Sequence, residues 1–364
     1  MKLSEIIAVF ESYAPLSYQE SYDNAGLTVG DTGMEISAAL LCIDVTEAVV
    51  DEARQQGANL IISHHPVIFK PLKQLTAGTG PERIIISAIT YKIALYCAHT
   101  NMDNISGGVN RKICQKLNLE KTRILSPLPN SLRKLVTFVP TASAEEVRSA
   151  LFAAGAGNIG AYDSCSFNLE GKGSFRASEG SNPYAGEIGK LHFENETRIE
   201  TIFPAVWKTR IIKALLKVHP YEEVAYDIFP VENEYEQAGW GMIGELKEPV
   251  NSLDYLQQIK DIFRCQVIRH TRVISKTVKK IAVCGGSGSF LIHRARSSGA
   301  DMFITGDLKY HQFFDAEDLI VIVDIGHFES EQFTIEIFYE ILKKNLPNFA
   351  IHFSSIQTNP IYYL

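Results

Sequence analysis

The sequence lacks the features of a membrane, secreted or nucleic-acid-binding protein. No segment approaches the roughly 18 apolar residues of a transmembrane helix. Glu5 and Glu11 interrupt the first apolar residues, so we expect no signal peptide. The six cysteines are scattered without a C-x-x-C pair, which favours reduced core residues and a cytoplasmic protein. The net charge of -7 argues against a nucleic-acid partner, which normally requires a basic patch.

The 364 residues predict two or three domains. Near the N-terminus, apolar stretches typical of strands alternate with stretches typical of helices, and the C-terminal part repeats this alternation. Strand–helix–strand order predicts a largely parallel sheet covered by helices. We therefore expect one discontinuous three-layer α/β domain from residues 1–126 and 244–364. Its first elements are predicted as strands at 38–45, 58–65 and 93–100 and as helices at 46–57 and 80–92.

The middle of the chain contains an internal repeat. Residues 137–163 match residues 201–227 without a gap, and both copies end in Ala-Tyr-Asp. Each copy has the pattern of a strand, a helix and a second strand. Two such units in tandem predict a ferredoxin-like α+β domain with four strands and two helices. We expect this domain over 127–243, inserted into the larger one.

Two adjacent histidines, His64 and His65, follow an apolar run and precede Pro66. Adjacent strand residues point to opposite faces, so two imidazoles reach one ion only if the backbone leaves strand geometry. Alternatively, each binds its own ion in a two-metal site. Open α/β sheets place ligands at the carboxyl ends of their strands, which favours metal binding. A pair of structural histidines is the other interpretation.

Two further clusters lie at the ends of predicted strands. His99 and Asp103 belong to one, and His327 and Glu331 belong to the other, four residues apart on one helical face. Each cluster alone also suits a turn, a helix cap or solvated side chains. Mixed nitrogen and oxygen ligands suit zinc, iron, manganese or nickel, and one carboxylate can bridge two ions. The combined set therefore predicts a site for two divalent ions, zinc first, with these ligands: His64, His65, Asp103, His327 and Glu331.

Two other stretches are candidates for holding a substrate. The glycine loop at 285–288 can hold a phosphate through its backbone N–H groups, or form a plain tight turn. Lys309 and His311 are candidate catalytic residues, Lys309 for an anionic group and His311 for proton transfer, or polar surface residues. The stretch with Asp23 and Asn24 is interpreted as a loop that covers the site.

Six motifs occur in a specific order: YDNAGLTVG, ISHHP, AHTNMDN with GGVN, CGGSGS, TGDLKYH and DIGHFESE. Together they resemble the NIF-three-like family, also known as GTP cyclohydrolase one type two homologs, over both flanks of the chain. The stretch HPYEEVAYDI at 219–228 resembles the middle domain of longer members, which is similar to the PII and CutA ferredoxin-like folds. One departure is Tyr22, where many relatives carry Trp.

The resemblance implies that the five predicted ligands bind two metal ions, with Glu331 as the bridge. It also implies a toroidal homohexamer in which the middle domains cap the openings. Two functions follow. The first is a metal-dependent hydrolase acting on a small nucleotide or another anion, with GTP ring opening as the specific version. The second is a non-catalytic metal-binding scaffold or metal chaperone with a regulatory middle domain.

Overall fold

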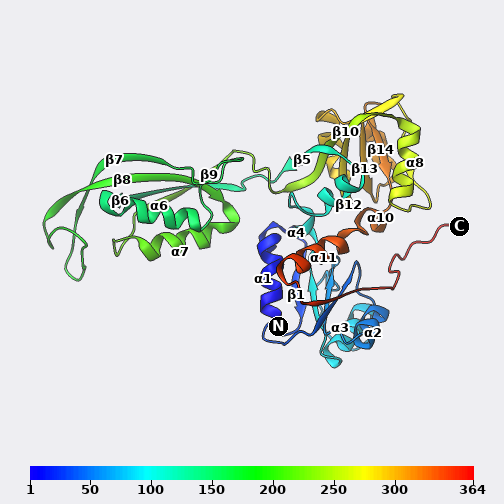
Figure 1. Ribbon diagram of the computed structural model, residues 1–364, viewed down its shortest axis with the longest axis horizontal. Helices are drawn as coiled ribbons and strands as arrows, with labels where there is room; N and C mark the ends of the chain where they lie inside the picture. The colour runs from blue at the N-terminus through cyan, green and yellow to red at the C-terminus, as the bar shows by residue number, and fades with distance from the viewer. The chain divides into compact units, whose positions relative to one another are not determined.

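The computed structural model describes all 364 residues, which form two compact units (Figure 1). The first unit comprises Met1–Pro127 and Glu236–Leu364, and the second comprises Leu128–Tyr235. The second unit ends before the predicted boundary at 243. Strand β10 (Gly239–Asn251) instead belongs to a sheet of the first unit, where the side chains of Met242 and Ile243 are buried.

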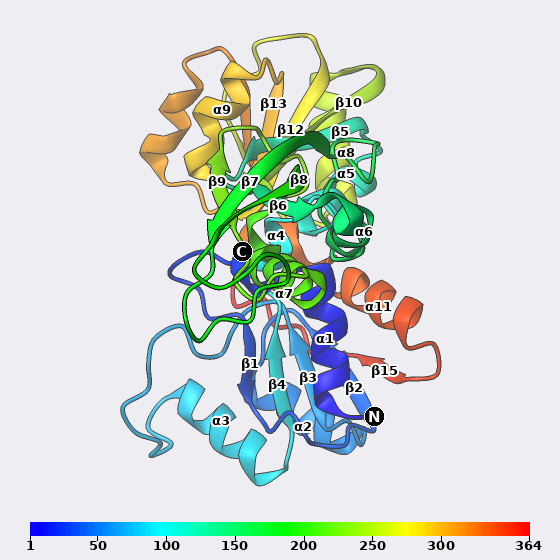
Figure 2. The same ribbon diagram turned by 90° about the vertical axis from the view of Figure 1, so that its left-hand side faces the viewer.

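The first unit contains a five-stranded sheet with the strand order β1-β4-β3-β2-β15 (Figure 2). The last four strands in this order run parallel, and β1 pairs antiparallel with β4 at the edge. Three of them are buried at every position, as expected of parallel strands covered on both faces. The strands are β1 (Gly26–Val29), β2 (Ala38–Cys42), β3 (Leu60–Ser63), β4 (Ala94–Cys97) and β15 (Ala350–Phe353).

Helices cover both faces of this sheet. On one face, α2 (Glu47–Gln55) and α3 (Gly80–Thr90) pack their apolar side chains against alternate strand residues. On the other face, α1 (Leu3–Tyr13) and α11 (Thr334–Asn345) meet through Phe10 and Phe338, whose ring centroids lie 5.6 Å apart. Thr46 caps α2, because its side chain accepts the Val49 N–H at 3.3 Å.

A second sheet of the first unit has the order β11-β14-β13-β12-β10-β5. Its three middle strands β12, β13 and β14 are parallel, and the flanking pairs are antiparallel. Its strands are β5 (Glu120–Pro127), β10, β11 (Arg269–His270), β12 (Thr277–Ser287), β13 (Met302–Gly306) and β14 (Val321–Asp324). The remaining helices of the first unit are α4 (Thr100–Asp103), α5 (Val109–Lys116), α8 (Ser252–Ile262), α9 (Ile292–Ser297) and α10 (His327–Glu331).

The sequence predicts one largely parallel sheet for both flanks, and the structure has two mixed sheets instead. Each sheet has its own apolar core, one built around α2 and α3 and the other around α9. Strand patterning indicates which residues are buried but not which strands pair, so it does not distinguish one sheet from two. The C-terminal strand β15 returns to β2 of the first sheet.

The second unit contains a four-stranded antiparallel sheet with the order β7-β8-β6-β9. Its two helices pack on one face around a shared apolar core. The first repeat copy differs from the prediction, because residues 159–162 form a turn and the next strand begins only at Phe167. The elements are β6 (Leu132–Pro140), α6 (Ala144–Ala153), β7 (Phe167–Arg176), β8 (Leu191–Pro204), α7 (Lys208–Val218) and β9 (Tyr226–Val231).

No helix of the chain has both the length and the apolar character that crossing a membrane requires. All six cysteines are free, and five of them are buried, as expected for core residues. Short 3-10 helices complete the chain at Leu16–Tyr18, Thr141–Ser143, Ala205–Trp207, Ser289–Leu291 and Tyr310–Ala316.

Candidate metal centre

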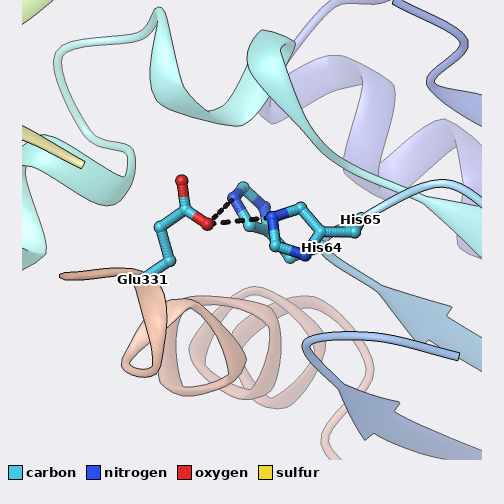
Figure 3. A group of neighbouring side chains, drawn as sticks. All are labelled: His64, His65 and Glu331. Carbon is cyan, nitrogen blue, oxygen red and sulfur yellow. Dashed lines mark hydrogen bonds and ion pairs between the residues drawn. The ribbon is translucent and has the colours of Figure 1, made fainter. Parts of the chain in front are cut away.

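The two neighbouring histidines follow β3 at the point where the backbone leaves strand geometry. The N–H groups of His64 and His65 both donate to the carbonyl of Ile43, at 3.1 and 2.9 Å. This bend turns both side chains to the same side, with ring centroids 5.0 Å apart. Figure 3 shows both imidazoles directed at the carboxylate of Glu331, which comes from α10 beside the second sheet. The cluster therefore joins the carboxyl ends of strands from both sheets.

His64 is fully buried and has one nitrogen available. Its Nδ1 lies 2.9 Å from the carbonyl oxygen of Ala98, which can only accept, so Nδ1 carries the proton. The other ring nitrogen, Nε2, faces Asp103 Oδ1 and Glu331 Oε2, each at 3.6 Å. These distances are too long for hydrogen bonds. His64 Nε2 and Asp103 Oδ1 are both buried without a hydrogen-bond partner. Two buried polar atoms that face each other without partners are costly, and a cation between them would satisfy both.

His65 and His327 bind Glu331 in a matching way. The Nδ1 atom of each imidazole forms a hydrogen bond with a second carboxylate, on the side of the ring away from Glu331. His65 bonds Asp44 at 2.7 Å, and His327 bonds Asp307 at 2.6 Å. Their Nε2 atoms lie 2.9 and 3.1 Å from Glu331 Oε2, and 3.2 Å from each other. An acid on the far nitrogen is the arrangement that orients metal-binding histidines in proteins.

Glu331 lies at the centre of the cluster. Its side chain is 3% exposed, and Oε2 is within 3.6 Å of the Nε2 atoms of His64, His65 and His327. The ligand atoms of His64, His65 and Glu331 all lie within 4.8 Å of one another. Gly286 allows this position, because its φ is +62° and a Cβ there would lie 2.3 Å from Glu331 Oε1.

The charges of the cluster perturb its pKa values strongly. Burial raises the pKa of Asp103 to about 7. Burial opposes the protonation of His65, but its hydrogen bonds with Asp44 and Glu331 outweigh this and raise the pKa to about 9. The same balance, with Asp307 and Glu331 as partners, raises the pKa of His327 to about 11. Without metal, protons therefore supply the positive charge that Glu331 requires.

A cleft of about 820 Å³ opens onto the cluster. Its walls include the aromatic side chains of Tyr22, Phe69, Trp240 and Phe290, and its base includes His65, Asp103, His327 and Glu331. A site for small molecules typically has this combination of apolar walls and a few convergent polar groups. The cleft lies entirely within the first unit.

The model of the Duf34/NIF3 (NGG1p interacting factor 3) family matches residues 1–360. The chain belongs to this family. It is 41% identical over 326 residues to the GTP cyclohydrolase 1 type 2 homolog of Bacillus subtilis, covering 89% of this chain and 87% of the relative. It is 39% identical over 364 residues to the homolog of Halalkalibacterium halodurans, covering 99% and 98%. The crystal structure of the Bacillus cereus protein related to NIF3 matches with a TM-score of 0.86 at 40% identity, covering 100% and 99%.

In this Duf34/NIF3 chain, the two residues predicted to be catalytic do not line the cleft. Lys309 and His311 are exposed, and the contacts of His311 are with the rings of Tyr310 and Phe314. Asp307 of the same motif is the residue that reaches the cluster, through His327. The reason is that the chain passes the end of β13 at Asp307 and then turns away into a 3-10 helix.

The glycine loop at 285–288 is also unsuited to hold a phosphate. The N–H groups of Gly285, Gly286 and Gly288 donate to side-chain oxygens of the chain itself, each at 2.9 Å. The acceptors are Asn110, Ser330 and Thr305. These bonds fix the loop against Glu331, so the tight-turn interpretation describes it better than the phosphate cradle.

The loop before β1, predicted to cover the site, contributes Tyr22 to the lining of the cleft, whereas Asp23 and Asn24 are not among the lining residues. Asp23 bonds His99 Nδ1 at 2.8 Å and the backbone N–H of Thr100 at 3.1 Å. Burial alone would raise the pKa of Asp23, but the hydrogen bonds with His99 and Thr100 lower it to about 2. The His99 ring centroid is 5.4 Å from those of both His64 and His65, so His99 is a wall residue.

Sequence reasoning missed Asp44. This acid follows β2, the strand next to β3, and holds His65 on one side and the Thr358 hydroxyl on the other, at 2.7 Å each. The rule that pointed to His64 also applies to Asp44, because both follow the carboxyl ends of neighbouring parallel strands. Assigning residues 38–45 entirely to a strand concealed it.

Proposed function

We propose that this protein binds two divalent metal ions and uses them as a hydrolase. The observation that carries the proposal is the arrangement of three imidazole Nε2 atoms around one buried carboxylate oxygen of Glu331. The two orphaned atoms, His64 Nε2 and Asp103 Oδ1, support it because a cation would satisfy both.

The donor set divides into two groups that share Glu331. His64 and Asp103 would hold one ion, and His65 and His327 would hold the other, with Glu331 as the bridge. Such a set of imidazole and carboxylate donors suits zinc first, and also iron, manganese or nickel. Asp44 and Asp307 would keep His65 and His327 in the required orientation through their Nδ1 atoms.

Two bound divalent ions would lower the pKa of a water molecule and polarise the bond under attack. The chain's own residues would then position the substrate and limit access of water. Phe69, Trp240 and Phe290 offer an apolar wall for a flat or apolar body. No lysine or arginine lines the cleft, so an anionic group of the substrate would have to bind at the metal centre. We therefore favour a small substrate with one oxygen-rich group, such as a nucleotide or another anion.

The name of the curated relatives suggests GTP as a specific substrate. A purine ring would fit the aromatic walls. The triphosphate would find no cationic side chain in the cleft, which makes GTP ring opening the less favoured version.

The same lack of cationic side chains favours a second candidate, a non-catalytic metal-binding scaffold or metal chaperone. In that function the cleft would admit a partner that delivers or removes the ions. The two candidates differ in one observable property: a hydrolase turns over a substrate with metal in place, whereas a chaperone transfers its metal to an acceptor.

Metal content per chain tests the proposal. We would purify the protein without chelator, reconstitute it with zinc and measure the metal by elemental analysis. About two ions per chain are expected in the wild type, with loss of both in Glu331→Gln and in the double variant His64→Ala/His65→Ala. His293→Ala, which changes an exposed histidine outside the cluster, is the matched control. Normal metal content in folded Glu331→Gln would exclude Glu331 as the bridge.

We also propose a role for the second unit and an assembly state. The strand order β7-β8-β6-β9 with two helices on one face supports a ferredoxin-like domain of the PII/CutA kind, with a regulatory function. The family resemblance supports a cytoplasmic homohexamer. Light scattering on the purified chain would test the hexamer, and a monomer at micromolar concentration would exclude it.

A further inference from the structure

The second unit contains a cleft of its own, which lies beside an extended ribbon of two strands. Strand β6 ends at Pro140, opposite Glu196, but β8 and β7 continue past it to Leu191 and Arg176. The loop at the end of this ribbon is tied back, because the N–H of Asn182 donates to the carboxylate of Glu222 at 2.9 Å. Between the ribbon, this loop and the segment after α7 lies a cleft of about 650 Å³.

The cross-strand register defines which side chains face this cleft. Phe138 pairs with Arg198, and Arg198 pairs with Leu169, so the three share one face of the sheet. The core residues Leu135 and Val139 alternate with Phe138 and lie on the opposite face, against the helices. The cleft is therefore on the face that the helices leave free.

Two glycines on this face create the hollow. Gly171 and Gly173 follow Leu169 at intervals of two residues along β7, so all three lie on the same face of the strand. A Cβ on Gly171 would meet nothing within 4 Å, so its position is open space. A Cβ on Gly173 would lie 2.1 Å from Glu196 Oε2, so this glycine lets the carboxylate lie flat against the strand.

The walls are aromatic and the fixed polar group is a carboxylate. Phe138, Phe175, Tyr184 and Tyr221 line the cleft. The hydroxyl of Tyr221 donates to Glu196 Oε1 at 2.7 Å and holds the carboxylate in place. The other oxygen, Oε2, has no hydrogen-bond partner and is free to accept from a ligand. An aromatic surface with a carboxylate attracts organic cations through the ring faces and through charge.

The charge on the cleft face is negative overall. Arg198 is paired with Glu200 at 2.8 Å, and its guanidinium already lies over the Phe138 ring, 5.9 Å from the centroid. Lys172 and Arg176 of β7 also border the cleft, but the alternation of the strand directs their side chains to the opposite face of the ribbon. The acids that remain at the cleft include Glu196, Glu222 and Glu223.

We propose that this cleft binds a small organic ammonium ion, an amine carried on an apolar or aromatic body. The ammonium group would donate to Glu196 Oε2, and the body would lie over Gly171 between the aromatic walls. This site is separate from the metal centre and does not depend on the proposed hydrolase function.

Titration of the full chain with phenethylammonium, followed calorimetrically, tests the site. The comparison ligand is 3-phenylpropanoate, which has a similar body and the opposite charge. Gly171→Val fills the hollow without a clash, so binding that this variant removes is assigned to the cleft. We expect saturable binding of phenethylammonium that Gly171→Val abolishes and that Glu196→Gln weakens about ten- to hundredfold.

Glu145→Gln is the matched control, because Glu145 is an exposed acid of α6 outside the cleft. It should bind like the wild type. The proposal is overturned if phenethylammonium does not bind, if its binding is unchanged in Gly171→Val, or if 3-phenylpropanoate shows the larger Gly171→Val-sensitive binding.

Discussion

Asp44 offers a sharp test of the metal centre, because it touches one proposed ion position and not the other. Its Oδ1 orients His65 and its Oδ2 accepts from Thr358, both at 2.7 Å. Asp44→Asn keeps the shape of the side chain and removes the charge. Loss of such an outer partner typically costs 10- to 100-fold in metal affinity, or about 1.4–2.7 kcal/mol. We therefore expect the ion at His65 and His327 to bind about 10- to 100-fold more weakly.

The ion at His64 and Asp103 should keep its affinity, because His64 is oriented by the Ala98 carbonyl instead. Competition with a chelator of known affinity would resolve one weakened and one unchanged ion. Asp51→Asn, an exposed acid on α2, is the control. Equal weakening of both ions, or no weakening, would refute the assignment of separate positions that share Glu331.

Three further predictions concern protons, acid stability and the domain boundary. The pKa values of His65 and His327, about 9 and about 11, lie above neutral, so both imidazoles are protonated without metal. The pKa of Asp103, about 7, leaves this ligand about half protonated at pH 7. Zinc loading at pH 7 should therefore release between two and three protons per chain, measured in weakly buffered solution, and affinity should rise with pH. Glu52 is buried, which raises its pKa, but the hydrogen bonds that it accepts from Ser354 and Ser355 outweigh burial and lower the pKa. Its stabilising contribution, about 1–3 kcal/mol, is therefore present above the pKa of the unfolded chain and is lost as the pH falls through the pKa of the folded one. The difference in unfolding free energy between wild type and Glu52→Gln, measured by urea titration, should close on acidification. Replacing 128–235 by a short turn should leave a folded chain with normal metal content, because Pro127 already pairs with Gly239; an aggregated or metal-free product would contradict this.

The sequence predicted which polar side chains would come together better than it predicted the fold around them. Polar residues after apolar strands located His64, His65, Asp103, His327 and Glu331, and the structure brings these side chains into one cluster. Within each sheet the rule succeeds because parallel strands end at a common edge. That the edges of two separate sheets meet at this cluster is a property of the fold, which the prediction of a single sheet did not contain. Their role as metal ligands stays a prediction until metal is measured.

The pairing of strands that are distant along the chain could not be predicted from the sequence. Strand β15 joins β2 across almost the whole chain, and β10 joins the second sheet although it follows the insertion directly. Local patterns carry no information about such partners. The outward position of Lys309 has the same origin, since it depends on the direction of the chain after β13 and not on the strand itself.

The separation of the donors along the chain has a consequence for biosynthesis. His65 and Glu331 are 266 positions apart, and the last strand of the first sheet lies later still. During translation the early histidines emerge from the ribosome long before the carboxylate that completes their site. A nascent or prematurely terminated chain therefore lacks the cluster, and under the proposed function its capture of metal would signal that synthesis and folding have been completed.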